Sequence, residues 1–257
     1  KITKIVCTMK FFRDFMSKTI LITGAAKRIG KEITLTFSDM GWNIIIHYNS
    51  SKKDAEDLQS ILNSANPNSA KIIQANLDIQ EDVERLIHAS KSFFSRIDVL
   101  VNNASAFYPT PIKNASTDDW DKLIGSNLKG PLFLIKGLHE MIASVNGSII
   151  NITDTNLTKG VADFSVYTAA KGGLQSITKG LARELAPNIN VNAVAPGAML
   201  EPPDVTWSDE KKASVIKNIP LKRMGSEKDI ANTVKFLVNA KYITGQTIKV
   251  DGGRSLL

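Results

Sequence analysis

Tyr167 and Lys171 stand four residues apart, a spacing that places them on one face of a helix, one turn from each other. A phenol with its ordinary pKa of about 10 exchanges protons poorly at neutral pH, and a nearby ammonium group favours the phenolate and lowers that pKa. Such a pair can exchange a proton with a substrate carbonyl or imine. The same spacing is common on solvated helix faces, so the surrounding sequence must decide between a catalytic and a structural interpretation.

The elements that would position this pair are predicted by short apolar runs that alternate with longer amphipathic segments. The expected strands are residues 19–23, 42–48, 71–75, 98–102, 148–152, 190–194 and 246–250. The expected helices are a stretch after Gly30 to about residue 40, then 51–63, 81–94, 118–143 in one piece or in two around Gly130-Pro131, and 165–184. The predicted fold class is therefore α/β: a single-domain, Rossmann-like, doubly wound parallel sheet of about seven strands with helices on both faces.

Residues 16–257 are expected to form this domain, because no internal repeat, low-complexity tract or linker marks a second one. Residues 1–15 contain short apolar pieces broken by charges and lack a signal-peptide core. We expect them to be a disordered N-terminal extension, with a partner-binding tail as the alternative.

The composition narrows the function classes. Apolar residues make up 43% and charged residues 22%, an ordinary globular balance, and no apolar run approaches the ~20 residues that span a membrane. The single cysteine, Cys7, favours a reducing, cytoplasmic location, and the three scattered histidines indicate no metal site. Residues 1–15 carry part of the net charge of +7, and the modest excess elsewhere suits an anionic cofactor better than a nucleic acid.

A glycine-rich turn follows the first expected strand. Gly24 and Gly30 bracket it, and Arg28 stands where many such loops have a third glycine. Glycines let the backbone approach a pyrophosphate closely, and the following helix N-terminus favours its negative charge. The strand–turn–helix context predicts a dinucleotide site, with a plain strand–helix turn as the alternative.

The end of the second strand points to the form of the dinucleotide. An acid at this place binds the ribose 2′-hydroxyl of NAD, but here no carboxylate occurs before Asp54. Hydroxyls, an amide and cations, with Lys27 nearby, suit a 2′-phosphate instead, so we predict NADPH. Lys52 and Lys53 have the alternative of simply beginning a solvated helix.

Five motifs in this order resemble the short-chain dehydrogenase/reductase family over about residues 18–255. They are the 24–30 loop, Asn102-Asn103-Ala104-Ser105, the Tyr167–Lys171 pair, Pro196-Gly197, and residues 243–246 with 250–253. The resemblance implies an oxidoreductase with a nicotinamide cofactor. It also implies a homotetramer, with helices in 118–143 and 165–184 packed between subunits.

Three details resemble the pteridine reductases of that family. They are Arg28, the segment 105–111, and Asp154, which stands thirteen residues before Tyr167 where most family members carry serine. Two positions depart from the pattern. Ser50 stands where some pteridine reductases have an arginine for the 2′-phosphate, and Asn76 stands where an aspartate commonly contacts adenine.

The resemblance assigns roles residue by residue. The implied catalytic residues are Asp154, Tyr167, Lys171 and Asn127. The implied cofactor-binding residues are Gly24, Lys27, Arg28, Ile29, Gly30, His47, Tyr48, Asn49, Ser50, Ser51, Asn76, Leu77, Asn103, Ala104, Ser105, Lys171, Pro196 and Gly197. The implied substrate-binding residues are Arg28, Ser105, Phe107, Asp154, Tyr167, Met199, Leu200 and Trp207, with a flat pterin stacked on Phe107.

Several of these residues keep a structural alternative. Phe107 can be an ordinary core aromatic, Asp154 a strand-end cap, and Asn127 a helix-surface amide. The leading hypothesis is NADPH-dependent reduction of a dihydropterin, a dihydrofolate or a dihydromonapterin-like compound to the tetrahydro form. The alternatives are a reductase of another carbonyl, such as a 3-oxoacyl thioester, and a non-catalytic NADP-binding regulator.

Overall fold

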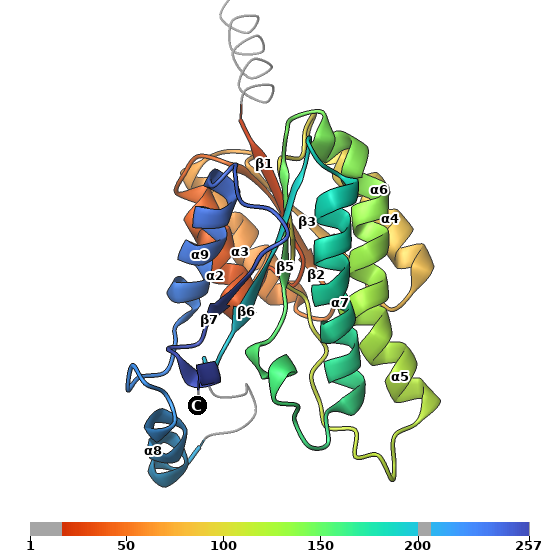
Figure 1. Ribbon diagram of the computed structural model, residues 1–257. Coiled ribbons are helices and arrows are strands. Elements are labelled where there is room, and N and C mark those ends of the chain that lie inside the picture. Colours follow the sequence, from red (N-terminus) through yellow and green to blue (C-terminus); the bar gives the residue numbers. More distant parts are fainter. Residues whose placement is uncertain (1–16, 200–206, 257) are drawn as a thin grey trace, which may run out of the picture.

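The computed structural model describes residues 17–199 and 207–256 (Figure 1). The expected extension, residues 1–15, lies outside this range, as does Leu200.

Seven parallel strands form one sheet in the order β3-β2-β1-β4-β5-β6-β7. They are β1 (Thr19–Ile22), β2 (Asn43–Tyr48), β3 (Ala70–Gln74), β4 (Val99–Asn102), β5 (Ser148–Ile152), β6 (Asn190–Pro196) and β7 (Thr247–Val250). Strands β1, β2, β4 and β5 are buried along their whole length, because helices cover both faces of the sheet. Double burial explains why they read as continuous apolar runs. The predicted fold class is confirmed.

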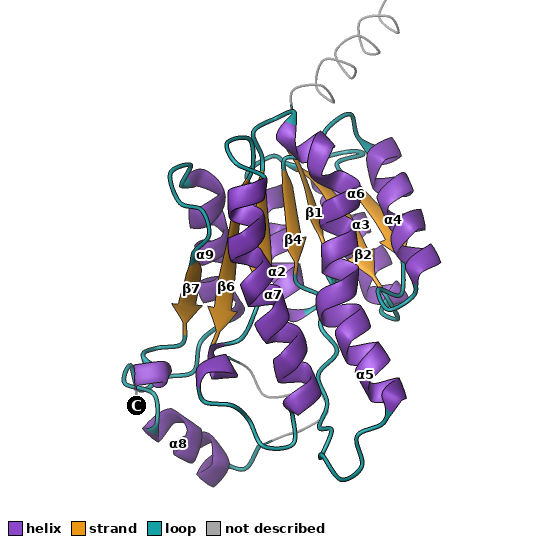
Figure 2. Ribbon diagram, turned by 45° about the vertical axis from the view of Figure 1, so that its right-hand side comes forward, coloured by secondary structure: helices purple, strands orange, loops and turns teal. Residues whose placement is uncertain are grey.

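Two helical layers enclose the sheet (Figure 1). One layer holds α2 (Arg28–Ser38), α3 (Lys52–Ala65) and α9 (Glu227–Asn239), and the other holds α4 (Gln80–Phe93), α6 (Gly130–Ala143) and α7 (Ser165–Glu184). Two short helices, α5 (Thr117–Ile124) and α8 (Asp209–Lys217), lie beyond the carboxyl end of the sheet (Figure 2). None of the described helices is long and apolar enough to cross a bilayer.

The helical stretch 118–143 is in two pieces, and the second begins at Gly130, as the two-piece alternative around Gly130-Pro131 predicted. A π-helical turn at Gly125–Lys129 separates α5 from α6, and Pro131, which has no N–H to donate, lies in the first turn of α6. The turn is close to the chain that follows β3. A β-carbon on Gly125 would lie 2.8 Å from the Cα of Asp78, so only glycine fits there.

Helices α8 and α9 lie outside the predicted elements. Helix α9 starts with a capping box, in which the Ser226 hydroxyl accepts from the Asp229 amide and the Asp229 carboxylate accepts from the Ser226 amide. Ser208 caps α8 in the simpler way, through the Lys211 amide. Both caps are visible in the sequence as a serine before an acidic first turn.

Candidate active site

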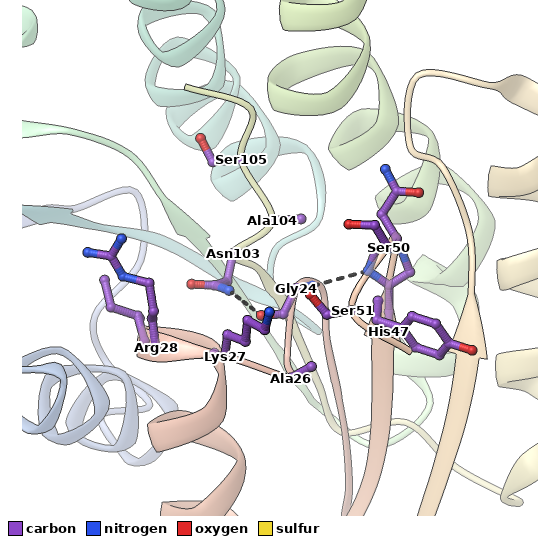
Figure 3. Close-up of a pocket in the computed structure, with 14 residues that line it drawn as sticks. Gly24, Ala26, Lys27, Arg28, His47, Ser50, Ser51, Asn103, Ala104 and Ser105 are labelled. Carbon is purple, nitrogen blue, oxygen red and sulfur yellow. Dashed lines mark hydrogen bonds between the residues drawn. The ribbon is translucent and has the colours of Figure 1, made fainter. Parts of the chain in front are cut away.

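The turn between β1 and α2 has the backbone shape of a phosphate loop. Gly24 and Arg28 both adopt left-handed conformations, with φ of +62° and +51°. This explains why glycine is common at the position of Arg28 in such loops. Asn103 fixes the turn from the end of β4, since its Nδ2 donates to the carbonyls of Thr23 at 2.8 Å and Gly24 at 3.2 Å (Figure 3). A β-carbon on Gly30 would collide with the Gly24 carbonyl, so this crossing requires glycine.

His47 joins three strands beneath this turn. Its Nδ1 accepts from the Gly24 amide at 3.1 Å, and its Nε2 donates to the Ala75 carbonyl at 3.0 Å. The ring is buried, and burial lowers its pKa to about 4. Because both ring nitrogens form hydrogen bonds to the backbone, His47 holds the turn in place from beneath.

A cavity of about 360 Å³ lies over the turn (Figure 3). It brings together most of the residues expected to bind the cofactor, and no carboxylate is among them. The lining residues are Gly24, Ala26, Lys27, Arg28, Ile29, Gly30, His47, Tyr48, Asn49, Ser50, Ser51, Asn103, Ala104 and Ser105. Ala26 is an addition that the motif spacing did not single out. The glycine crossing and the acid-free lining fit a dinucleotide diphosphate.

The sequence predicts cations near a 2′-phosphate, but the lysines near this cavity form ion pairs with acidic side chains. Lys27 forms an ion pair with Asp54 at 3.0 Å, so the first carboxylate after β2 reaches back to the loop. Lys52 and Lys53 pair with acids one turn further along α3, at 3.7 and 2.9 Å. These two lysines follow the solvated-helix alternative.

Five expected cofactor residues lie outside the cavity; Lys171 is described below, and the other four are Asn76, Leu77, Pro196 and Gly197. Leu77 is buried in the core, and the Asn76 amide donates to Asp82 at 2.6 Å. Pro196 and Gly197 follow β6, where the Pro196 carbonyl accepts from the Thr155 hydroxyl and the Gly197 amide donates to Val250. Contact of these four with a cofactor stays a prediction.

Asp154 and Tyr167 form a direct pair. The phenol donates to Asp154 Oδ2 at 2.9 Å, and Asp154 Oδ1 accepts from the Asn156 amide at 2.7 Å. Asp154 therefore caps the turn at Thr155–Thr158, as the structural alternative has it, and also contacts the phenol. Burial first, and then the Asp154 charge, raise the pKa of Tyr167 well above its usual range.

Lys171 does not act on Tyr167 as expected. Its Nζ donates to the Ile152 carbonyl at 2.9 Å, and burial lowers the pKa of this ammonium to about 8. The prediction that Lys171 lowers the phenol pKa is therefore wrong in this structure. Burial and a neighbouring carboxylate both disfavour the phenolate, so Tyr167 carries its proton at neutral pH.

Asn127 is fully buried in the π-helical turn, so it is not a surface amide. Its Nδ2 donates to the carbonyls of Ala106 and Leu123, both at 3.0 Å, and its Oδ1 accepts from the Ser105 hydroxyl at 2.7 Å. Asn127 thus fixes the chain that leads from β4 to Phe107.

Phe107 is not a core aromatic, because 57% of it is exposed. It stacks on Phe164 with ring centroids 4.6 Å apart and meets Tyr167 edge-on at 4.9 Å. Phe164 is a site residue that the motif search missed. Its signal was an aromatic residue directly before the expected helix 165–184 and three residues before Tyr167.

Of the expected substrate-binding residues after Gly197, Met199 and Trp207 are described and Leu200 is not. Met199 is buried in the core cluster beside α9, so the structure does not place its side chain over the site. Trp207 is half-buried just before α8. Among the described residues, no group of three or more histidine, cysteine or acidic side chains is arranged to hold a metal ion.

Comparison with known proteins decides the family. A family model described as enoyl-(acyl carrier protein) reductase matches residues 24–255. The chain belongs to the short-chain dehydrogenase/reductase family. It is 40% identical over 242 residues to the 3-oxoacyl-[acyl-carrier-protein] reductase FabG of Staphylococcus epidermidis, covering 93% of this chain and 99% of the relative.

Two further relatives of this short-chain dehydrogenase/reductase carry names for two different activities. Pteridine reductase 1 of Leishmania tarentolae is 36% identical over 278 residues, covering 92% of this chain and 96% of the relative. The 3-oxoacyl-[acyl-carrier-protein] reductase of Synechocystis is also 36% identical, over 242 residues and with the same shares covered. The protein is thus an oxidoreductase of this family, and overall similarity does not single out the pteridine reductases.

Proposed function

We propose that this oxidoreductase uses NADPH to reduce a dihydropterin or dihydrofolate to its tetrahydro form. The hydrogen bond between Tyr167 and Asp154 carries the proposal. Reduction of a ring C=N bond adds a hydride to carbon and a proton to nitrogen. A carboxyl beside a protonated phenol supplies a proton relay suited to that nitrogen.

Different residues of the site would bind the cofactor, transfer the proton and hold the substrate. Bound NADPH supplies the hydride. The loop at 24–30 and the end of β2 hold the cofactor's phosphates and ribose, and Lys171 holds the nicotinamide ribose from the floor of the site. Tyr167 donates its proton to the substrate nitrogen, and Asp154 restores that proton from solvent. The open face of Phe107 stacks on the flat heterocycle.

A second candidate is reduction of a 3-oxoacyl thioester. It is favoured by the 40% identity to the staphylococcal 3-oxoacyl-[acyl-carrier-protein] reductase, which exceeds the 36% identity to pteridine reductase 1. The same Tyr167 would then protonate a ketone oxygen. Asp154 argues against this chemistry, because a second negative charge beside a developing oxyanion opposes it.

The first experiment compares NADPH oxidation with dihydrobiopterin and with an acetoacetyl thioester. In Asp154→Ser, kcat/KM for dihydrobiopterin is expected to fall about 100-fold or more, the usual contribution of proton transfer. Asp121→Ser, which removes an exposed acid on α5, is the matched control and should retain wild-type activity. Preference for the thioester, maintained or improved in Asp154→Ser, would establish the second candidate instead.

A further inference from the structure

A second cavity lies beside the turn that Asp154 caps. Its volume is about 510 Å³, and it lies between that turn, the end of α8 and the C-terminal turn Arg254–Leu256. Figure 1 places these segments together, below the carboxyl ends of β5, β6 and β7. The lining residues are Thr155, Asn156, Lys159, Gly160, Val161, Ala162, Asn218, Arg254 and Ser255.

This cavity is lined by two cations and no acid. Lys159 is exposed and Arg254 is half-buried, and neither forms an ion pair within the described part of the chain. Lys159 Nζ donates to the Arg254 backbone carbonyl at 3.5 Å, and both residues line the cavity. The other polar groups of the lining are hydroxyls and amides, which also hydrogen-bond to oxyanions.

Two carboxylates beside the lining, Asp154 and Asp251, already have hydrogen-bond partners. Asp154 accepts from the Asn156 amide and from the Tyr167 phenol. Asp251 accepts from the amides of Gly253 and Ser255, both at 2.9 Å. These acids therefore have hydrogen bonds of their own, and the two cations remain available to a ligand.

The cavity lies within reach of a substrate in the proposed site. Thr155 and Asn156 line it and follow Asp154 directly. Lys159 is five residues beyond Asp154, along a 3-10 turn that rises about 2 Å per residue, so the two lie on the order of 10 Å apart. A substrate whose reducible end contacts Tyr167 can place an extended tail in this cavity.

We propose that Lys159 and Arg254 form an anion subsite for the negatively charged tail of the substrate. The inference rests on the proposed function, because it takes Tyr167 and Asp154 as the point of reduction. Both candidate ligands carry an oxyanion on an arm of about 10 Å or more. The oxyanion is the glutamate carboxylate of a dihydrofolate or, for the second candidate, a phosphate on the arm of an acyl thioester.

Two pairs of substrates distinguish the glutamate carboxylate from the phosphate of the thioester arm as the bound anion. Dihydrofolate carries a glutamate tail and dihydrobiopterin carries none. Acetoacetyl-coenzyme A carries phosphates, and acetoacetyl-N-acetylcysteamine carries none. Within the pair that the enzyme reduces, we expect the charged member to have the lower KM, and we expect salt to weaken that advantage.

The variants test the two cations directly. Lys159→Ala and Arg254→Ala should each raise KM for the charged substrate about two- to fivefold, and the double variant about tenfold, as expected for exposed ion pairs. KM for the uncharged partner should not change, and Lys159→Arg should restore the wild-type value. Lys235→Ala removes an exposed cation from α9 and is the matched control.

The outcomes are distinct. Equal KM values for both members of the reduced pair, or equal losses for both in the variants, overturn the subsite and leave the proposed function standing. If neither core is reduced, the proposed function fails, and calorimetric titration with folate and coenzyme A decides on the subsite. Binding that weakens in the double variant supports it, and binding that is absent or unchanged overturns it.

Discussion

His47 shows how a single residue joins the cofactor loop to the sheet. The second expected strand ends in an apolar run followed by a histidine, a residue that sequence similarity assigns to the cofactor site. The structure commits both ring nitrogens to backbone groups of Gly24 and Ala75. Protonation of Nδ1 would place an N–H against the Gly24 N–H, so the charged form is incompatible with this arrangement.

This arrangement predicts a loss of stability in acid. The pKa of His47 is about 4 in the folded protein and 6.5 in an unfolded chain, so between these values the unfolded chain binds more protons. The free energy of unfolding should therefore decrease as pH falls from 6.5 to 4, by about 3 kcal/mol from this group. Urea titrations across that window measure the change.

The comparison of variants isolates the group. His47→Gln keeps one donor and one acceptor but does not titrate, so its stability should vary less with pH than that of the wild type. His88→Gln, on the exposed face of α4, should follow the wild-type curve. Identical pH dependence in wild type and His47→Gln would refute the assignment.

At the scale of elements, the π-helical turn between α5 and α6 fixes the chain that leads from β4 to Phe107. The turn places Asn127 where the side chain can hold Ser105 and Ala106. The turn depends on Gly125, because an added β-carbon would lie 2.5 Å from the Asp78 side chain and 2.8 Å from its backbone.

Gly125→Ala should therefore destabilise the protein by about 1–3 kcal/mol, the usual cost of overpacking. Gly172→Ala is the matched control, since a β-carbon there meets nothing within 4 Å. Alanine at this position in α7 should stabilise the helix by about 0.5–1 kcal/mol. Urea unfolding midpoints test both variants, and equal shifts for the two would contradict the close contact at Asp78.

Much of the architecture could be predicted because buried parallel strands leave a strong signal in the sequence. Each expected strand is present, with ends that shift by at most two residues. Helix α7 has the predicted bounds, because its apolar face repeats over 20 residues. Helix α8 has no buried residue, so it offered no periodic apolar face to detect.

The site was less predictable where tertiary contacts decide. Motif spacing brought together the loop, the end of β2 and residues 103–105, because all three follow neighbouring strands. It could not show that Lys171 bonds the Ile152 carbonyl, that Lys27 pairs with Asp54, or that Met199 is buried. These contacts depend on the three-dimensional distance between segments far apart in the chain.

In the whole molecule, the cofactor loop and the proposed catalytic residues lie at one edge of the sheet. The strand order reverses direction between β1 and β4, and ligands of such sheets bind at the carboxyl ends beside that point. The loop after β1, the residues after β4 and Asp154 after β5 all lie there. Loops at one edge can therefore vary the substrate while the buried strands keep the cofactor site.

The homotetramer implied by family resemblance remains a prediction, and its expected interface helices expose apolar side chains. Trp120 on α5 is 51% exposed and Leu132 on α6 is 36% exposed. If α5, α6 and α7 pack between subunits, light scattering should give about four times the 28.1 kDa chain mass. Trp120→Glu should then reduce the mass to that of a smaller species, because it places a charge in an apolar contact.

Ile61→Glu is the control for this test. Ile61 is 58% exposed on α3, which lies on the opposite face of the sheet, so the same substitution there should leave the assembly intact. A wild type that is monomeric, or equal dissociation by both variants, would show that these helices do not form the interface. Dissociation by Trp120→Glu alone would place α5 at the interface, and because α5 leads into the π-helical turn that holds Asn127, reductase activity should fall with the mass.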